Sequence, residues 1–334
     1  MILKSRAFSL ALLLAIAVMA PGVLKAQDAQ PMSETQLSTA GAGSKTTGGS
    51  ANGIAPGDLA APPATGTAGP EAAAFDGTYV WVATQFNDSV TRIRVSDGLV
   101  AGTFAVGKRP VALLYAAGSV WVANLLSDNV MKLNPATGAV TATYITGDGP
   151  GGLAFDGTNI WVANRESNDV TKLSAAGANL GTFAVGKRPM GVAVVGGAVF
   201  VVNNFSNSVM KLSASGAVLG TYPVGRGPFG VAGEGENVWV TNYFDKTVTK
   251  LRAADGFNLG TFKVGDGASG IAFDGTSMWV VSNGDNNVMK LAPSTGSVIS
   301  TYATGKGPFA VVFDGAKIWV PNFASNSISS TAAN

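Results

Sequence analysis

The sequence predicts an all-β fold, a seven-bladed β-propeller in which each blade is a four-stranded antiparallel sheet. Three observations predict it. A unit of about 40 residues recurs seven times, all six tryptophans lie on the lattice of that repeat, and each unit holds four short strand patterns separated by turns. A period of this length is typical of solenoids, propellers and arrays, and four strands per unit favour the propeller.

The repeat is visible in two residue types that recur in step along the chain. A proline opens almost every unit, with spacings of 40, 40, 39, 39, 40 and 40 residues, at Pro70, Pro110, Pro150, Pro189, Pro228, Ala268 and Pro308. An aromatic residue keeps the same period, at Trp81, Trp121, Trp161, Phe200, Trp239, Trp279 and Trp319. We expect these large rings to pack between neighbouring blades.

The third unit shows the four strands of one blade. Its strand patterns are rich in apolar, β-branched and aromatic residues and cover residues 152–155, 160–164, 170–173 and 180–185. Asp156-Gly157 turns the chain after the first strand, and we expect such Asp-Gly pairs on the lower face, where the turn needs left-handed backbone geometry. One position of the third strand is basic in six units, which predicts a solvated or salt-bridged blade edge: Arg92, Lys132, Lys172, Lys211, Lys250 and Lys290.

The last unit is incomplete, and this predicts how the ring closes. It runs from Pro308 to Asn334 and reaches only a third strand pattern, near residues 327–329. We therefore expect residues within about 55–69 to supply the fourth strand of the last blade, so that the start of the chain pairs with its end.

The residues before the repeats predict export. Lys4 and Arg6 precede an uncharged, mostly apolar run over residues 7–24, and Leu24-Lys25-Ala26 fits a signal-peptidase site. An uncleaved membrane anchor is the alternative reading. We expect residues 1–26 to be a Sec-type signal peptide, 27–57 a low-complexity flexible linker, and 58–334 the propeller, with blades starting near residues 70, 110, 150, 189, 228, 268 and 308. The mature chain is then expected to be periplasmic, cell-surface or extracellular, monomeric, and without a membrane span.

The units resemble the YVTN family of β-propeller repeats. The matching strand ends are Trp121-Val122-Ala123-Asn124, Trp161-Val162-Ala163-Asn164, Trp239-Val240-Thr241-Asn242 and Trp319-Val320-Pro321-Asn322. That resemblance covers residues 70–334 and implies a surface or periplasmic propeller. More distantly the blades resemble the virginiamycin B lyase group, seven-bladed propellers that open a cyclic peptide lactone with a divalent metal and an essential histidine. This chain contains no His, so no residue can take that role.

The residue types that are absent exclude many mechanisms. With no His and no Cys, the chain can form neither a Ser-His-Asp or Cys-His arrangement nor a zinc site of the His and Cys type. We assign no catalytic residue, no metal and no cofactor. Loss of Lys4, Arg6 and Lys25 with the leader would leave 19 basic residues against 20 acidic ones, so no nucleic-acid partner is expected.

The candidate ligand-binding residues lie on the upper face, which carries the loops between blades and the loops joining second to third strands. The inter-blade loops are mostly basic, with Lys108, Arg109, Lys187, Arg188, Arg226 and Lys306. The other loops add Arg165, Tyr243 and Phe244, and we favour the patch of Tyr243 and Phe244 beside Arg226 and Arg165. These residues indicate a site for an anionic ligand; loop solubility is the alternative explanation. Phe229 and Phe309 follow lattice prolines and are expected around the channel mouth.

These observations favour an exported, non-catalytic binding or scaffold protein that uses its upper face for an unidentified ligand or protein partner. Two alternatives stay open. One is a metal-dependent lyase or hydrolase using carboxylates such as Glu166, Asp148 or Asp285. The other is a structural cell-surface spacer. Fold analogy alone does not separate these alternatives.

Overall fold

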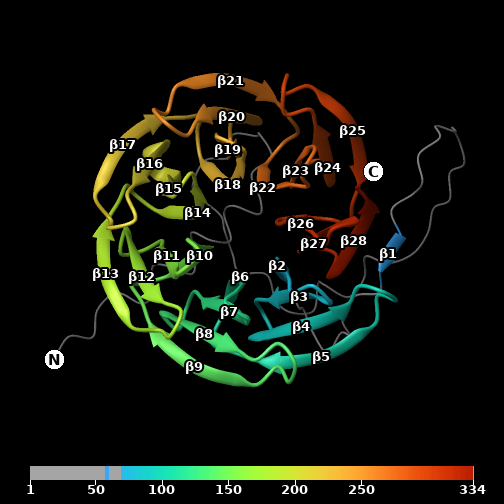
Figure 1. Cartoon of the computed structure of the whole chain (residues 1–334). Coiled ribbons are helices and arrows are strands. Elements are labelled where there is room, and N and C mark those ends of the chain that lie inside the picture. The colour runs from blue at the N-terminus through green and yellow to red at the C-terminus, as the bar shows by residue number, and fades with distance from the viewer. Residues whose placement is uncertain (1–56, 60–68, 334) are drawn as a thin grey trace, which may run out of the picture. The chain divides into compact units, whose positions relative to one another are not determined.

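The computed structural model describes residues 57–59 and 69–333. These residues form seven four-stranded antiparallel sheets arranged as the blades of a propeller (Figure 1). This confirms the predicted fold class. The predicted signal peptide and all but the last residue of the predicted linker lie outside the described residues, so export and localisation stay predictions.

The first six blades take their four strands in chain order from the axis to the rim. Blades 1 to 3 comprise β2 (Pro70–Phe75), β3 (Tyr79–Thr84), β4 (Ser89–Arg94) and β5 (Val100–Ala105); β6 (Pro110–Ala116), β7 (Ser119–Asn124), β8 (Asn129–Leu133) and β9 (Val140–Ile145); β10 (Pro150–Phe155), β11 (Asn159–Asn164), β12 (Asp169–Ser174) and β13 (Asn179–Ala184). Blades 4 to 6 comprise β14 (Pro189–Val195), β15 (Ala198–Asn203), β16 (Ser208–Leu212) and β17 (Val218–Pro223); β18 (Pro228–Glu234), β19 (Asn237–Asn242), β20 (Thr247–Arg252) and β21 (Asn258–Lys263); β22 (Ala268–Phe273), β23 (Met278–Ser282), β24 (Asn287–Leu291) and β25 (Val298–Ala303). A 3₁₀ turn, Asn204–Ser206, follows β15.

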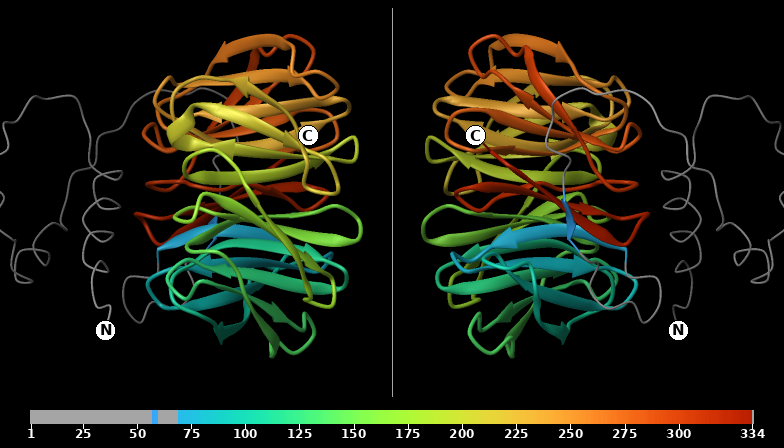
Figure 2. Two further views of the ribbon diagram at one scale, coloured as in Figure 1. Left: turned by 90° about the vertical axis from the view of Figure 1, so that its left-hand side faces the viewer. Right: turned by 90° about the vertical axis from the view of Figure 1, so that its right-hand side faces the viewer.

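The seventh blade joins the two ends of the described chain. It comprises β26 (Val312–Phe313), β27 (Lys317–Asn322), β28 (Ser327–Ala332) and, as its outer strand, β1 (Gly57–Leu59). Gly57 pairs with Ser330 and Leu59 with Ile328, and Figure 2 shows β1 alongside β28. The pairing confirms the predicted ring closure by the start of the chain.

The lattice aromatic residues fill the spaces between blades. All six tryptophans and Phe200 are fully buried. Trp121 of blade 2, for example, packs against Ile160, Val162 and Leu173 of blade 3. Each sheet therefore buries both faces against its neighbours, and the tryptophans form the core of the ring, as predicted.

The Asp-Gly turns hold the tryptophans in place. In blade 3, Asp156 Oδ1 accepts the amide N–H groups of Thr158 and Asn159, while Oδ2 accepts the indole Nε1–H of Trp161 at 2.8 Å. The same indole bond is made by Asp76, Asp274 and Asp314. Blade 4 has Phe200 instead of tryptophan and Gly196-Gly197 in place of the Asp-Gly turn, so donor and acceptor are lost together.

The basic residues of the third strand link neighbouring blades. Lys172 Nζ lies 5.1 Å from the centre of the Trp161 ring and donates to the carbonyl of Ala214 in the next blade at 2.7 Å. Equivalent bonds to the next blade are made by Arg92, Lys132, Lys211, Lys250 and Lys290. The predicted solvated or salt-bridged edge is borne out in part, because the side chains are half-buried and Lys250 also forms an ion pair with Glu234; the bonds to the next blade were not predicted.

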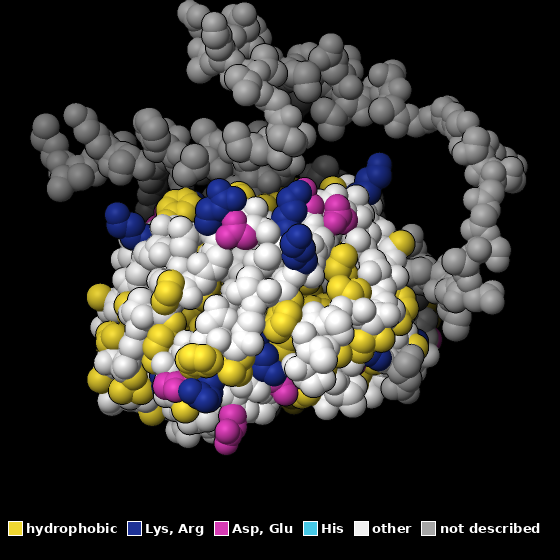
Figure 3. Space-filling view, turned by 90° about the horizontal axis from the view of Figure 1, so that it is seen from above, with side chains coloured by type: hydrophobic (Ala, Val, Ile, Leu, Met, Phe, Trp, Pro, Cys, Tyr) yellow, Lys and Arg dark blue, Asp and Glu magenta, His cyan; other side chains and the backbone are white. Residues whose placement is uncertain are grey.

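Charged side chains gather at the two faces of the ring. Figure 3 views the ring from its rim, where Lys, Arg, Asp and Glu lie along two edges and the strip between them is mostly apolar or uncharged. Among the described residues, no helix is long and apolar enough to cross a membrane.

Candidate ligand-binding site

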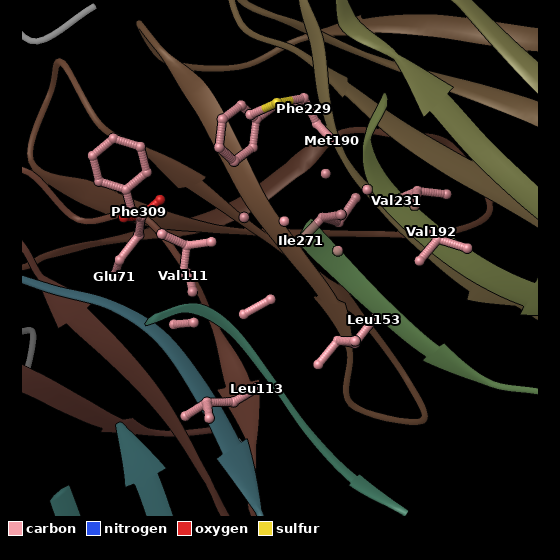
Figure 4. A pocket seen from close by; sticks show the side chains of 18 of the residues that line it. Glu71, Val111, Leu113, Leu153, Met190, Val192, Phe229, Val231, Ile271 and Phe309 are labelled. Atoms are coloured by element: carbon pink, nitrogen blue, oxygen red, sulfur yellow. The ribbon is translucent and has the colours of Figure 1, made fainter. Parts of the chain in front are cut away.

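The central channel opens into a cavity of about 210 Å³ near the upper face. Its wall is formed by the first residues of the inner strands, which begin at that face (Figure 4). Most lining side chains are small or apolar, such as Val111, Leu153 and Met190. Glu71 and Arg165 are the two lining residues with ionisable side chains. The channel therefore presents two opposite charges on an apolar wall.

Arg165 reaches the cavity because its neighbour is a glycine. It directly follows β11, and its side chain crosses the start of β10, where a Cβ on Gly151 would lie 1.9 Å from Arg165 Nε. Arg165 Nη2 donates to the carbonyl of Gly151 at 3.2 Å, and the residue is only 5% exposed. The buried Nε–H has no hydrogen-bond partner. Burying a donor without a partner is costly, so the unpaired Nε–H requires an explanation.

Two further arginines occupy backbone positions that suit glycine. The residue before each lattice proline or alanine has a positive φ, and in five blades it is glycine: Gly69, Gly149, Gly227, Gly267 and Gly307. In the other two it is Arg109, with φ 56°, and Arg188, with φ 54°. A left-handed conformation in a non-glycine residue costs about 1–3 kcal/mol. The structure thus holds two arginine side chains at this face against a local preference for glycine.

The preceding blade fixes the backbone of both arginines. Asp88 Oδ1 accepts the amide N–H of Arg109 at 2.8 Å, and Asn168 Oδ1 accepts that of Arg188 at 2.7 Å. Arg188 is 7% exposed, its guanidinium lies 4.8 Å from the centre of the Phe205 ring, and its Nε has no hydrogen-bond partner. Arg109 Nε donates to Gln85 Oε1 at 2.7 Å. We call Arg109, Arg165 and Arg188 the arginine cluster.

The cluster interacts electrostatically with Glu71. Burial is the main cause that lowers the pKa of Arg165 to about 10; Glu71 opposes this effect, and Arg188 and Arg109 add to it. Burial raises the pKa of Glu71, and the attraction of Arg165 and Arg109 offsets this only in part. Glu71 is half-buried: the cavity leaves part of its side chain accessible to water, and protein atoms surround the rest. Glu166 also favours the charged form of Arg165, so two carboxylates, Glu71 and Glu166, act on the cluster of three guanidinium groups and offset its positive charge only in part.

The raised pKa of Glu71 predicts a pH-dependent stability. Because the folded chain holds the Glu71 proton to a higher pH than the unfolded chain, stability falls as pH rises above the ordinary value of 4.5. Glutamine stays neutral, so we expect Glu71→Gln to raise the melting temperature at pH 7 and to lose this advantage by pH 4. Thermal denaturation of both proteins at pH 7 and pH 4 measures this difference in melting temperature. Glu236→Gln on the exposed lower turn is the control, and a gain for Glu71→Gln that is the same at both pH values would contradict the account.

The structure places the other predicted residues outside the cluster. Lys108 Nζ pairs with Asp88 at 2.7 Å, and Arg226 Nε pairs with Asp245 at 2.6 Å. Lys187 and Lys306 are exposed on their loops. Of the nine predicted residues, the three arginines of the cluster come together.

The favoured patch is divided between two parts of the ring. Tyr243 and Phe244 contact each other edge to face, with ring centres 5.4 Å apart, in blade 5. Arg226 lies next to them, and its carbonyl accepts the amide N–H of Phe244. Arg165 belongs to blade 3, so blade 4 separates it from Tyr243. Arg165 lies instead with Arg109 and Arg188.

Sequence reasoning missed Glu71 and the role of Gly151. A signal for both exists in the residue that follows each lattice proline or alanine: Glu71, Val111, Gly151, Met190, Phe229, Ser269 and Phe309. Glu71 is the one acidic residue in that series, and Gly151 is its one glycine. Phe229 and Phe309 line the cavity, in agreement with their expected place at the channel mouth.

The carboxylates considered for a metal-dependent reaction do not form a donor cluster. Within residues 57–59 and 69–333, no group of three or more acidic side chains is arranged to hold a metal ion. Asp285 Oδ2 accepts the amide N–H of Asp266, and Glu166 lies beside Gly149.

The chain matches no protein-family model and no curated protein. Its fold is similar to solved structures of hydrazine synthase from Kuenenia stuttgartiensis, at 18% identity over 80% of this chain and 97% of that chain, with a TM-score of 0.73. It is also similar to virginiamycin B lyase from Staphylococcus aureus, at 17% identity over 81% of this chain and 97% of that chain, with a TM-score of 0.72. A streptogramin B lyase gives 17% identity, coverage of 80% and 94%, and a TM-score of 0.71.

At these identities the likeness shows the fold alone, because one fold hosts many unrelated functions. The structural neighbours include the lyase propellers named from the sequence. Membership of the YVTN repeat family stays a prediction.

Proposed function

We propose that this chain is an exported, non-catalytic binding protein that holds an anionic ligand at the arginine cluster. The observation that carries the proposal is the pair of unpartnered Nε–H groups on Arg165 and Arg188, both more than nine-tenths buried. A guanidinium group that keeps buried donors free is prepared to form charge-assisted hydrogen bonds with a carboxylate, phosphate or sulfate.

The charge balance supports the same proposal. Arg188 and Arg109 each repel Arg165, and Glu71 forms no ion pair with any of the three among the described residues. An anion in the mouth of the channel would offset this repulsion. Three other cations of the face, Lys108, Arg226 and Lys246, already have carboxylate partners.

The backbone at Arg188 offers a test that separates binding from stability. Since five of the seven equivalent positions are glycine, we expect Arg188→Gly to change the free energy of unfolding by less than about 1 kcal/mol. The loss of one charge-assisted contact is expected to weaken pyrophosphate binding by about tenfold. Isothermal titration calorimetry at two salt concentrations, with urea denaturation of the same samples, measures both quantities.

Arg226→Ala is the matched control, because Arg226 is a guanidinium of the same face that is already paired with Asp245. Its pyrophosphate affinity should equal that of the wild type. The proposal is wrong if the wild type binds no pyrophosphate, or if Arg188→Gly binds it as tightly as Arg226→Ala does.

A further inference from the structure

The channel mouth carries a second feature, a continuous row of aromatic rings. Adjacent members of the row have ring centres 5.4 to 6.3 Å apart, and the order is Phe244, Tyr243, Phe229, Phe309, Phe323 and Phe86. Phe229 and Phe309 line the cavity itself, and Figure 4 shows their rings at its edge. Phe244 and Phe86, at the two ends, are each 55% exposed. We call these six residues the aromatic row.

The aromatic row and the arginine cluster divide the mouth between them. The row comes from blades 5, 7 and 1, whereas Arg109, Arg165 and Arg188 come from blades 2, 3 and 4. Since the blades follow one another around the ring (Figure 1), one arc of the mouth is cationic and the remaining arc is aromatic. A ligand that covers the mouth meets both.

Packing between the sheets does not account for the aromatic row, although Phe86 and Phe244 lie against Gly69 and Gly227 of the inter-blade loops. The blades are held by the lattice tryptophans and Phe200, which are fully buried between sheets. The rings of the row lie instead in loops or at strand starts, and they are exposed or half-buried. Clustered aromatic side chains that stay accessible to solvent mark binding surfaces.

From this division we infer that the ligand is an amphipathic organic anion, with an acidic head group and an aromatic or planar apolar body. The inference rests on the proposed function and adds the chemical class of the ligand. The head group binds the unpartnered Nε–H groups of Arg165 and Arg188. The body lies against Phe229 and Phe309 on the other side of the mouth, where ring stacking and burial of apolar area add affinity.

The size of the cavity limits what enters it. Its volume of about 210 Å³ is below the roughly 300–1,000 Å³ of pockets that enclose drug-sized ligands. It therefore accepts a small molecule of one or two rings, or one end of a longer ligand whose remainder lies on the exposed part of the row.

Three probes separate the two contributions. Naphthalene-2-sulfonate has both the anion and the rings, methanesulfonate has the anion alone, and naphthalene-2-sulfonamide has the rings without the charge. By calorimetry we expect naphthalene-2-sulfonate to bind the wild type at least about tenfold more tightly than either of the others. In Phe309→Leu, naphthalene-2-sulfonate should lose most of its higher affinity relative to methanesulfonate, while the affinity for methanesulfonate stays unchanged.

Phe257→Leu, at an aromatic residue of the lower face that is 59% exposed, is the control and should change nothing. Phe86→Leu gives a second test with a side chain that is 55% exposed, and a reduced affinity for naphthalene-2-sulfonate alone is expected. Equal affinities for naphthalene-2-sulfonate and methanesulfonate would overturn the inference and leave anion binding intact. If no anion binds, both the inference and the proposed function are wrong.

Discussion

Replacement of Trp161 by alanine is expected to lower the free energy of unfolding by about 3–5 kcal/mol. The indole is fully buried between blades 3 and 4, where it packs with Val192, Val199 and Leu212. Alanine would leave a cavity between two sheets and would also leave Asp156 without its indole donor. Urea denaturation followed by circular dichroism measures the change.

Trp161→Phe is the matched variant, because Phe200 occupies the same position in blade 4. It keeps most of the buried ring and loses mainly the hydrogen bond to the Asp156 carboxylate, so a loss of about 1.5–3 kcal/mol is expected. If alanine and phenylalanine cost the same, the contact between blades is not the main contribution of this residue.

Replacement of Arg165 by methionine is expected to weaken anion binding by about 10- to 100-fold, the equivalent of a charge-assisted hydrogen bond of roughly 1.5–3 kcal/mol. Methionine fills a similar space without charge, so the comparison isolates the guanidinium group. Arg165 is the member of the cluster that lines the cavity and the one that interacts with both other arginines. Titration of the variant with pyrophosphate measures the loss.

Gly151→Ala tests the same contact without removing any charge. Its Cβ would lie 1.9 Å from Arg165 Nε, so the side chain must leave its position over β10. We expect a loss of affinity in the same direction as for Arg165→Met. Gly284→Ala on the same face, where the nearest atom is 3.1 Å away, is the control. Unchanged affinity in both Arg165→Met and Gly151→Ala would exclude Arg165 from the site.

The fold was predictable because each blade is specified by its own short stretch of chain. The proline and tryptophan lattices repeat within about 40 residues, and a blade contacts mainly its neighbours in the ring. The incomplete last unit was sufficient to predict the pairing of β1 with β28. The bonds from Lys172 and its equivalents to the next blade were not predictable in this way, because their acceptor carbonyls come within reach only when two blades have assembled.

The site was predictable only in part. The repeat places Arg109, Arg165 and Arg188 on one face, but it does not show which loop side chains turn toward the axis. That depends on left-handed backbone at Arg109 and Arg188 and on the absent side chain of Gly151. Comparison of the seven inter-blade loops with one another would have shown two arginines at a glycine position. Tyr243 and Arg165 lie on the same face, each directly after the second strand of its blade. The two blades are not neighbours, however, because blade 4 lies between them.

The most direct test of the anion site is the NMR signal of the arginine Nε–H groups during titration with pyrophosphate. Selective arginine labelling makes these groups visible, and the Arg165→Met and Arg188→Gly spectra assign them. We predict that the Nε–H signals of Arg165 and Arg188, which lack partners in the folded chain, move together and saturate with one dissociation constant, while that of Arg226 stays in place. Stationary Arg165 and Arg188 signals, at pyrophosphate concentrations that saturate the calorimetric response, would contradict the account.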